Sequence, residues 1–242
     1  MINRLPVAET FHSIQGEGTY IGTPMHFVRL AGCPVGFKAT EEAVTALSPG
    51  DHEVIPVLQS GQRGSLCKTW DGRRFTCDTD FSCHTYKTVD ELIGETHENH
   101  ICLTGGEPLI HQKALLEAGF FQQAFARKID IHIETSGTVM LDPRLKDDFR
   151  IWVTVAPKWN YLEEMIMCAD EIKLLIDENF STAKVSEILQ WIPESLSQEI
   201  YICPINEEKT VNQKNVDRCM EILKTHPDWK LSVQLHKFLG LR

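Results

Sequence analysis

The sequence predicts an α/β fold in the form of a partial, TIM-like β/α barrel. From about residue 100 onward, short apolar and β-branched segments alternate with helical patterns, as in parallel βα units. Polar or glycine-rich motifs follow these segments, as they do at the mouth of such barrels. The chain has 242 residues and 42% hydrophobic content, which is enough to bury the core of one domain.

The predicted strands cover residues 26–33, 100–107, 129–137, 150–158, 170–176, 199–206 and 230–237. Helical patterns lie between them at 111–128, 161–169, 181–192 and 211–226, with Ser181 and Asn212 as expected N-caps. The carboxyl ends of parallel strands share one mouth. We therefore expect the active site where these strands end.

Residues 34–76 break the alternation, because they are rich in Gly, Pro and Ser and show no clear period. We interpret them as an insertion after the first barrel strand, within a single domain that covers residues 1–242. A structureless loop of this length is improbable inside a compact domain. The insertion is therefore expected to contain a short helix near residues 40–47 and a small hairpin, from which it could cover the site.

Composition excludes several classes of function. The formal charge of -10 disfavours a surface for nucleic acid, which needs clustered Lys and Arg. The N-terminus has no run of signal-peptide length and no segment is apolar enough to span a membrane, so we expect a cytoplasmic protein. In that compartment the eight cysteines should stay reduced, which leaves metal binding, catalysis or burial.

Four cysteines stand at loop positions near the predicted insertion. Cys33 ends the first barrel strand, and Cys67, Cys77 and Cys83 follow much later. Soft thiolates in loops select iron-sulfur clusters or zinc, and three ligands would leave one iron of a cluster open. The spacing Cys33-x33-Cys67-x9-Cys77 matches no compact metal motif, so spacing alone leaves buried core cysteines as an equal alternative.

Several longer segments occur in a fixed order along the chain. They are "FHSIQGEGTYIGTPMHFVRLAGCPVG", "CDTDF", "LTGGEPLIH", "IETSGT", "VTVAPKWN" and "QLHKFLGLR". Together they resemble the 7-carboxy-7-deazaguanine synthases of the radical S-adenosylmethionine superfamily. The resemblance implies a partial barrel of the radical S-adenosylmethionine type, with a [4Fe-4S] cluster, S-adenosylmethionine and Mg2+ as cofactors. It implies a lyase that contracts the ring of 6-carboxy-5,6,7,8-tetrahydropterin to 7-carboxy-7-deazaguanine with loss of ammonia, in queuosine-type biosynthesis.

The resemblance also implies which cysteines would bind the cluster. Cys33 matches the first family cysteine, and Cys77, at the head of "CDT", matches the last. Phe37 stands where the family's second cysteine is expected, so Cys67, at the end of the insertion, is the expected middle ligand. Cys83 is the rival for this place, although it lies beyond the "CDT" that closes the family motif.

Residues on the cofactor side follow from the same resemblance. Those expected to contact S-adenosylmethionine are Gly105, Gly106 and Glu107 at its amino group, Glu134, Thr135 and Ser136 at its ribose and methionine parts, and Lys158 at a carboxylate. The chain departs from the family at Cys203, because relatives often carry Gln before the following Pro. A side-chain hydrogen bond at this place is therefore in doubt.

The substrate side is expected to combine charged side chains with one magnesium ligand. The residues that the resemblance implies for substrate binding are Gln15, Glu17, Arg29 and His236. Thr79 is the implied Mg2+ ligand, since a single protein oxygen with water and substrate suits this ion. The neighbouring carboxylate of Asp80 remains a competitor for that role.

Two other functions share part of this pattern. A radical S-adenosylmethionine enzyme of another subclass, such as a glycyl-radical activase, would share the cluster and cofactor motifs, but "SIQGEG" and "LHKFLG" favour the synthase. A catalytically inactive zinc-binding module on the same fold is the second alternative, and Phe37 encourages it. The resemblance further implies a flavodoxin-type electron donor and a homodimer.

Overall fold

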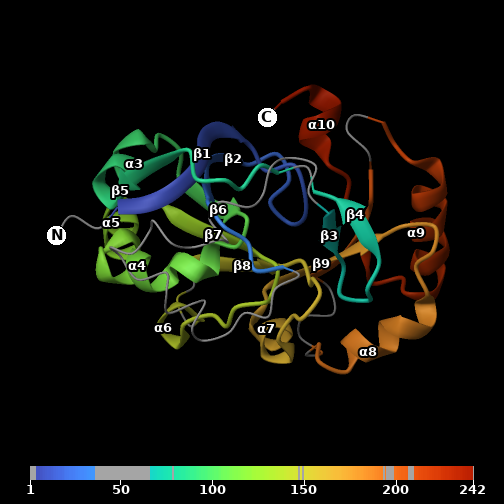
Figure 1. Cartoon of the computed structure of the whole chain (residues 1–242). Coiled ribbons are helices and arrows are strands. Elements are labelled where there is room, and N and C mark those ends of the chain that lie inside the picture. Colours follow the sequence, from blue (N-terminus) through green and yellow to red (C-terminus); the bar gives the residue numbers. More distant parts are fainter. Residues whose placement is uncertain are drawn as a thin grey trace.

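A nine-stranded, mostly parallel sheet forms the centre of the molecule (Figure 1). The computed structural model describes residues 4–35, 66–77, 79–146, 148, 150–192, 194, 199–206 and 210–241. The parallel strands are β2 (Pro24–Leu30), β6 (His100–Gly105), β7 (Asp130–Thr135), β8 (Ile151–Val155), β9 (Glu171–Ile176), β10 (Ile200–Pro204) and β11 (Lys230–Leu231). They lie side by side in the order β2, β6, β7, β8, β9, β10, β11.

Two antiparallel strands extend the sheet beyond β2. They are β1 (Arg4–Ile14), which pairs with β2, and β5 (Thr85–Thr88), which pairs with β1. In the described part of the chain, β5 and β11 are the edges of the sheet and do not pair with each other. The barrel is therefore incomplete, as the sequence predicts, although the sequence analysis assigned no strand to residues 4–14.

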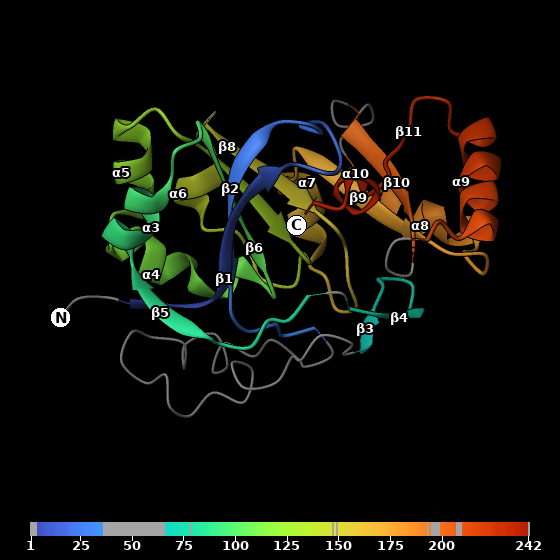
Figure 2. The same ribbon diagram turned by 90° about the horizontal axis from the view of Figure 1, so that it is seen from above.

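Helices follow the outer side of the curved sheet (Figures 1 and 2). They are α3 (Val89–Glu95), α4 (Gln112–Glu117), α5 (Phe120–Ala126), α6 (Pro143–Lys146), α7 (Glu163–Cys168), α8 (Val185–Leu189) and α9 (Gln213–Thr225). None of the helices in the described residues is long and apolar enough to cross a membrane. The short helix α10 (Leu235–Leu239) lies apart from them, near the loop between β1 and β2, where the Leu235 N–H donates to the carbonyl of Gly16.

Alternation within the strands divides the interior into two layers. Outward side chains of β6 to β9 are aliphatic and pack under the helices; they include Ile101, Leu103, Ile131, Ile133, Val153, Ile172 and Leu174. Inward side chains of the same strands are mostly polar; they include Cys102, Thr104, His132, Glu134, Thr154 and Lys173. Because successive residues of a strand face opposite sides, each strand supports the core with one face and the site with the other.

Two predicted elements differ in the structure. The expected strand 230–237 pairs with β10 only at Lys230 and Leu231, and its second half forms α10 instead, which is capped by Gly240 at φ 67°. The expected helix 111–128 divides into a 3-10 turn (Pro108–His111), α4 and α5. The break lies at Gly119, whose φ of 74° favours glycine and ends a regular helix.

The two predicted helix caps have different outcomes. The Asn212 side chain accepts from the Asn215 N–H and caps α9, as predicted. Ser181 makes no capping hydrogen bond with its side chain, and a 3-10 turn (Thr182–Lys184) leads into α8 instead.

The predicted insertion ends in a hairpin beside the sheet. Strands β3 (Leu66–Lys68) and β4 (Arg74–Thr76) pair with each other and form a separate two-stranded sheet. A small hairpin was expected within residues 34–76, and β3–β4 confirms this. Phe37 and the helix expected near residues 40–47 lie outside the described residues.

The aliphatic layer should dominate the stability of the fold. Ile133 lies in the middle of β7 and is 1% exposed, so Ile133→Ala should lower the free energy of unfolding by about 2 to 5 kcal/mol in a urea titration. Met220 on α9 is 48% exposed, and Met220→Ala is the control, with an expected change within about 0.5 kcal/mol. Equal effects of the two substitutions would contradict this description of the core.

Candidate functional site

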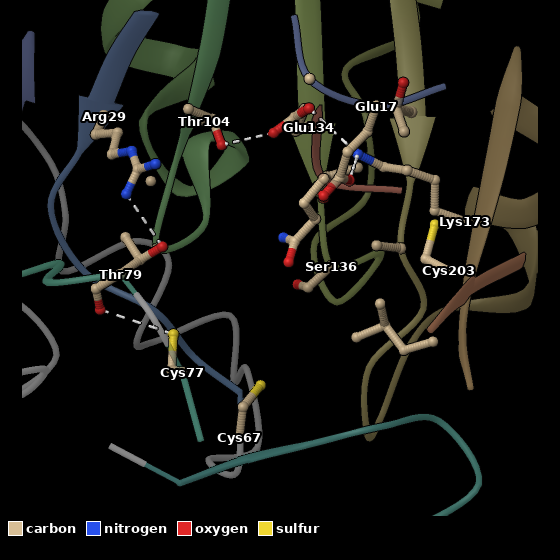
Figure 3. A pocket seen from close by; sticks show the side chains of 18 of the residues that line it. Glu17, Arg29, Cys67, Cys77, Thr79, Thr104, Glu134, Ser136, Lys173 and Cys203 are labelled. Carbon is tan, nitrogen blue, oxygen red and sulfur yellow. Dashed lines mark hydrogen bonds and ion pairs between the residues drawn. The ribbon is translucent and has the colours of Figure 1, made fainter. Parts of the chain in front are cut away.

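A pocket of about 310 Å3 opens where the parallel strands end, a size that suits a small organic ligand (Figure 3). Besides the ends of β2 and β6 to β10, its lining includes the hairpin β3–β4, the loop around Gln15 and helix α10 with His236. The sequence-predicted residues among its lining are Gln15, Glu17, Arg29, Cys33, Cys67, Cys77, Thr79, Gly105, Gly106, Glu134, Thr135, Ser136, Lys158 and His236. The strand-end motifs therefore meet in one cavity, with the exception of Glu107.

Three thiols reach the pocket from separate segments. Cys33 follows β2, Cys67 lies on β3 and Cys77 follows β4; all three are partly buried. Burial raises the pKa of Cys33 to about 12, and the two other thiols add to this shift. The Lys158 ammonium acts in the opposite direction on Cys67, although burial keeps the pKa of that thiol raised. Cys83 lies outside the lining, and its thiol donates to the carbonyl of Thr85 at 3.5 Å.

No three His, Cys, Asp or Glu side chains converge as a single metal ion would require among the residues that the structure describes. A [4Fe-4S] cluster makes a different demand, because each thiolate binds a different iron and the sulfur atoms need not converge. Soft donors that share one pocket, with a lysine beside them, fit such a cluster chemically.

Glu107 lies beneath the pocket and is absent from its lining, so its contact with the cofactor stays a prediction. The side chain is 0% exposed, and it accepts from the Thr135 hydroxyl at 2.8 Å, the Ser136 N–H at 2.8 Å and the Leu109 N–H at 3.1 Å. The Ser136 hydroxyl also donates to it. Burial raises the pKa of Glu107, and these hydrogen bonds oppose that effect. The carboxylate therefore holds two other predicted residues in place.

A buried lysine organises the opposite side of the pocket. The Lys173 Nζ lies 2.9 Å from Glu17 Oε2 and 3.3 Å from Glu134 Oε1. Glu134 also accepts from Gln15 Nε2 at 3.1 Å and from the Thr104 hydroxyl at 3.0 Å. Although burial raises the pKa of Glu134, Lys173 and these hydrogen bonds outweigh it and lower that pKa to about 2. Glu134 thus belongs to a carboxylate–lysine group that the sequence analysis did not foresee.

Lys173 and Thr104 belong to this lining, although the sequence analysis assigned neither of them to the site. Lys173 carried a usable signal, because a charged residue interrupts the apolar strand "DEIKLLI". A buried charge is rare unless it is paired, so such a lysine indicates acidic partners on neighbouring strands. Thr104 gave no comparable signal, since threonine is common in buried strands.

Arg29 and Thr79 form a third group of side chains in the pocket, besides the thiols and the carboxylate–lysine group. Arg29 Nη1 donates to the Thr79 hydroxyl at 3.2 Å and lies 3.5 Å from Glu9, while the guanidinium covers the Phe11 ring at 5.3 Å. Among the described residues, the buried Nε of Arg29 has no hydrogen-bond partner. An unsatisfied donor beside a cavity indicates a ligand with an acceptor such as a carboxylate.

The carboxylate of Asp80 points into its own loop. It accepts from the Ser82 N–H at 2.9 Å and lies 3.2 Å from His84 Nε2, and Asp80 is absent from the lining of the pocket. Thr79 is therefore the better placed of the two competitors for a cation. Asp78 lies outside the described residues.

Helix α10 places His236 against the loop that carries Gln15. A Cβ atom at Gly16 would lie 2.0 Å from His236 Nδ1, so only glycine allows this approach. A second contact fixes the same loop, because the Gly18 N–H donates to the Ser232 hydroxyl at 3.0 Å. Residues 220 positions apart in sequence thereby close one wall of the pocket.

Comparisons with known proteins agree with this geometry. No protein-family model matches the chain. The chain is 30% identical to the 7-carboxy-7-deazaguanine synthase of Buchnera aphidicola subsp. Schizaphis graminum, over 98% of this chain and 99% of that protein. It is 29% identical to the synthase of Synechocystis sp., over 98% and 93%. Its fold is similar to the crystal structure of QueE from Escherichia coli, with a TM-score of 0.63, 27% identity and coverage of 96% and 95%.

Removal of the Lys173 ammonium should destabilise the protein in a pH-dependent way. Lys173→Met leaves two partly buried carboxylates unpaired, so it should cost about 3 kcal/mol at neutral pH. The pKa of Glu134 is about 2 in the folded wild type, below the usual 4.5, so its contribution is present above pH 4.5 and is lost as the pH falls toward 2.

The difference between wild type and Lys173→Met should therefore shrink over that interval, as measured by denaturant titrations at several pH values. Lys214→Met is the control, because its ion pair with Glu178 is exposed and should contribute little. A difference that stays constant with pH would show that the pair is not the cause.

Proposed function

The chain belongs to the 7-carboxy-7-deazaguanine synthase family, and we propose that it is a radical S-adenosylmethionine lyase acting on 6-carboxy-5,6,7,8-tetrahydropterin. The product would be 7-carboxy-7-deazaguanine, with loss of ammonia. The observation that carries the proposal is one pocket that combines three thiols with an unsatisfied arginine and a carboxylate–lysine group. A flavodoxin-type electron donor, a homodimer and a cytoplasmic location stay predictions from the resemblance.

The thiols of Cys33, Cys67 and Cys77 would hold the [4Fe-4S] cluster. Three thiolates leave one iron open, which is where S-adenosylmethionine would bind. Bound together, the cluster and S-adenosylmethionine would supply the radical that removes hydrogen from the pterin. The Lys158 ammonium, which lies near all three thiols, would offset part of their negative charge.

The backbone around Gly106 suits the amino acid part of S-adenosylmethionine. A Cβ atom at Gly106 would lie 1.9 Å from the Gly32 carbonyl, so only glycine lets these two segments pack this closely beside Cys33, and Gly106 also lines the pocket. Lys158 lines the pocket, and its ammonium donates to the Ala156 carbonyl at 3.3 Å. Its positive charge would pair with the carboxylate of this cofactor. Thr135 and Ser136 complete this wall because Glu107 holds them.

The pterin would lie between Arg29 and the carboxylate–lysine group. Arg29 offers its Nε–H to the substrate carboxylate, and Thr79 offers a hydroxyl oxygen to Mg2+. Glu17 is a hydrogen-bond acceptor for the N–H groups of the amino-pyrimidine edge. Lys173 keeps the pKa of Glu134 low, so this neighbouring carboxylate stays ionised and accepting at neutral pH.

Cys67, not Cys83, should be required for cluster binding. After anaerobic reconstitution, wild type and Cys83→Ala should be brown and form 7-carboxy-7-deazaguanine with S-adenosylmethionine, dithionite, Mg2+ and 6-carboxytetrahydropterin. Cys67→Ala should lose the cluster absorbance and form no product, as followed by mass spectrometry. Brown wild type that cleaves S-adenosylmethionine without product would favour another radical subclass, and a colourless, zinc-containing wild type would favour the inactive module.

Arg29 should determine the affinity for the substrate carboxylate. Arg29→Gln removes a charge-assisted hydrogen bond of about 1.5 to 3 kcal/mol, so KM for the pterin should rise about tenfold to a hundredfold. Arg144→Gln is a matched control, because Arg144 pairs with Asp142 on the surface at 2.7 Å. An unchanged KM in Arg29→Gln would exclude Arg29 as the carboxylate ligand.

A further inference from the structure

The hairpin β3–β4 brings Cys67 to the pocket without belonging to the barrel sheet. It forms its own two-stranded sheet, in which Cys67 pairs with Phe75. A span of 33 residues separates Cys33 from Cys67, so local backbone geometry cannot fix the distance between their thiols. Contacts between the hairpin and the barrel must do so instead.

Arg73, directly before β4, makes several of these contacts. Its Nη2 donates to the Leu175 carbonyl at 2.7 Å, and its Nη1 lies 2.8 Å from Asp177 Oδ1, so both bind the end of β9. Its Nε donates to Asp71 at 2.7 Å, and the guanidinium covers the Phe180 ring at 4.9 Å. The Arg73 side chain is only 13% exposed. A planar fork with several directed donors suits such a junction, which lysine could not reproduce.

Short hydrogen bonds connect Arg73 to the strand of Cys67. The Asp71 carboxylate accepts from both Arg73 and the Thr69 hydroxyl, the latter at 2.6 Å. The Arg73 carbonyl accepts from the Thr69 N–H at 2.9 Å and from its hydroxyl at 3.0 Å. Thr69 is two residues from Cys67, so the position of this thiol follows from where Arg73 binds.

The other edge of the hairpin lies against the end of β8. Thr69 forms an antiparallel bridge with Lys158, and the Trp159 N–H donates to the Lys68 carbonyl at 3.0 Å. The Lys68 ammonium lies 3.1 Å from the centre of the Trp159 ring. These contacts set the register of β3 along the barrel, while Arg73 binds the tip of the hairpin to β9.

We propose that Arg73 is a positioning residue that holds the Cys67 thiol in reach of the cluster by fixing the hairpin to β9. The inference rests on the proposed function in one respect, namely that the ligand of Cys67 is an iron-sulfur cluster. Without Arg73, the buried Asp71 carboxylate loses its charge partner, and the hairpin loses its hydrogen bond to Leu175 and its ion pair with Asp177.

The first test uses the reduced protein without iron. Iodoacetamide labelling with peptide mass spectrometry should show Cys67 reacting about tenfold faster in Arg73→Ala than in wild type, with Cys33 unchanged as the internal control. Arg73→Lys should fall between them. Arg150→Ala is the matched control, since Arg150 also pairs with a nearby aspartate, Asp148 at 3.2 Å, and lies outside the pocket lining. Equal labelling of Cys67 in all variants would overturn the inference.

The second test measures the cluster itself. Iron content and the loss of cluster absorbance to a chelator are followed after anaerobic reconstitution, with thermal unfolding by circular dichroism as the check on folding. Arg73→Ala should lose its cluster about tenfold faster than wild type and Arg150→Ala.

The two tests separate the two proposals. Suppose that the wild type takes up no cluster, while Cys67 still reacts faster with iodoacetamide in Arg73→Ala. This result would reject the proposed function and leave the positioning role of Arg73 intact. A stable cluster in folded Arg73→Ala would reject the positioning role alone.

Discussion

Glu107 joins the ends of three neighbouring strands, and the shape of the pocket depends on it. The backbone N–H of Glu107 donates to the Gly32 carbonyl after β2 at 2.8 Å, and its buried carboxylate accepts from Thr135 and Ser136 at the end of β7. A buried carboxylate is costly unless such donors surround it. Since its oxygens accept these hydrogen bonds, Glu107 supports the part of the pocket wall that Thr135 and Ser136 form.

The pocket above this support is divided by charge (Figure 3). Glu17, Glu134 and Lys173 lie on one side, and Arg29, Cys67 and Cys77 lie on the other. Burial by itself would lower the pKa of Lys173, yet the two carboxylates raise it well above its usual value. The lysine therefore stays charged and lets two carboxylates persist inside the barrel, where acceptors for a nitrogen-rich ring are useful. An arginine on the far side then favours a ligand with its own carboxylate at the opposite end.

Strand ends were predictable because parallel strands must bring their carboxyl ends to one mouth, whatever the helices between them do. Lys173 was not assigned to the site, although a lysine within an apolar strand indicates acidic partners on neighbouring strands. The expected strand 230–237 failed for a tertiary reason. Its alternating Leu231, Val233 and Leu235 are typical of a strand, but the Leu235 N–H binds Gly16, far away in sequence, and the chain turns into a helix. Pairing partners of this kind have no local signal.

The place of Cys67 illustrates how tertiary contacts can replace a compact motif. Closing a longer loop costs little, about 0.6 kcal/mol for each doubling of its length, so an insertion between two cluster ligands is tolerated. The harder requirement is to hold the displaced thiol still. Arg73 meets it by binding Leu175 on β9, and Lys173 lies two residues earlier on the same strand. One strand therefore binds the hairpin of Cys67 at its end and carries Lys173 of the carboxylate–lysine group in its middle, so the rigid sheet sets the separation between these two parts of the pocket.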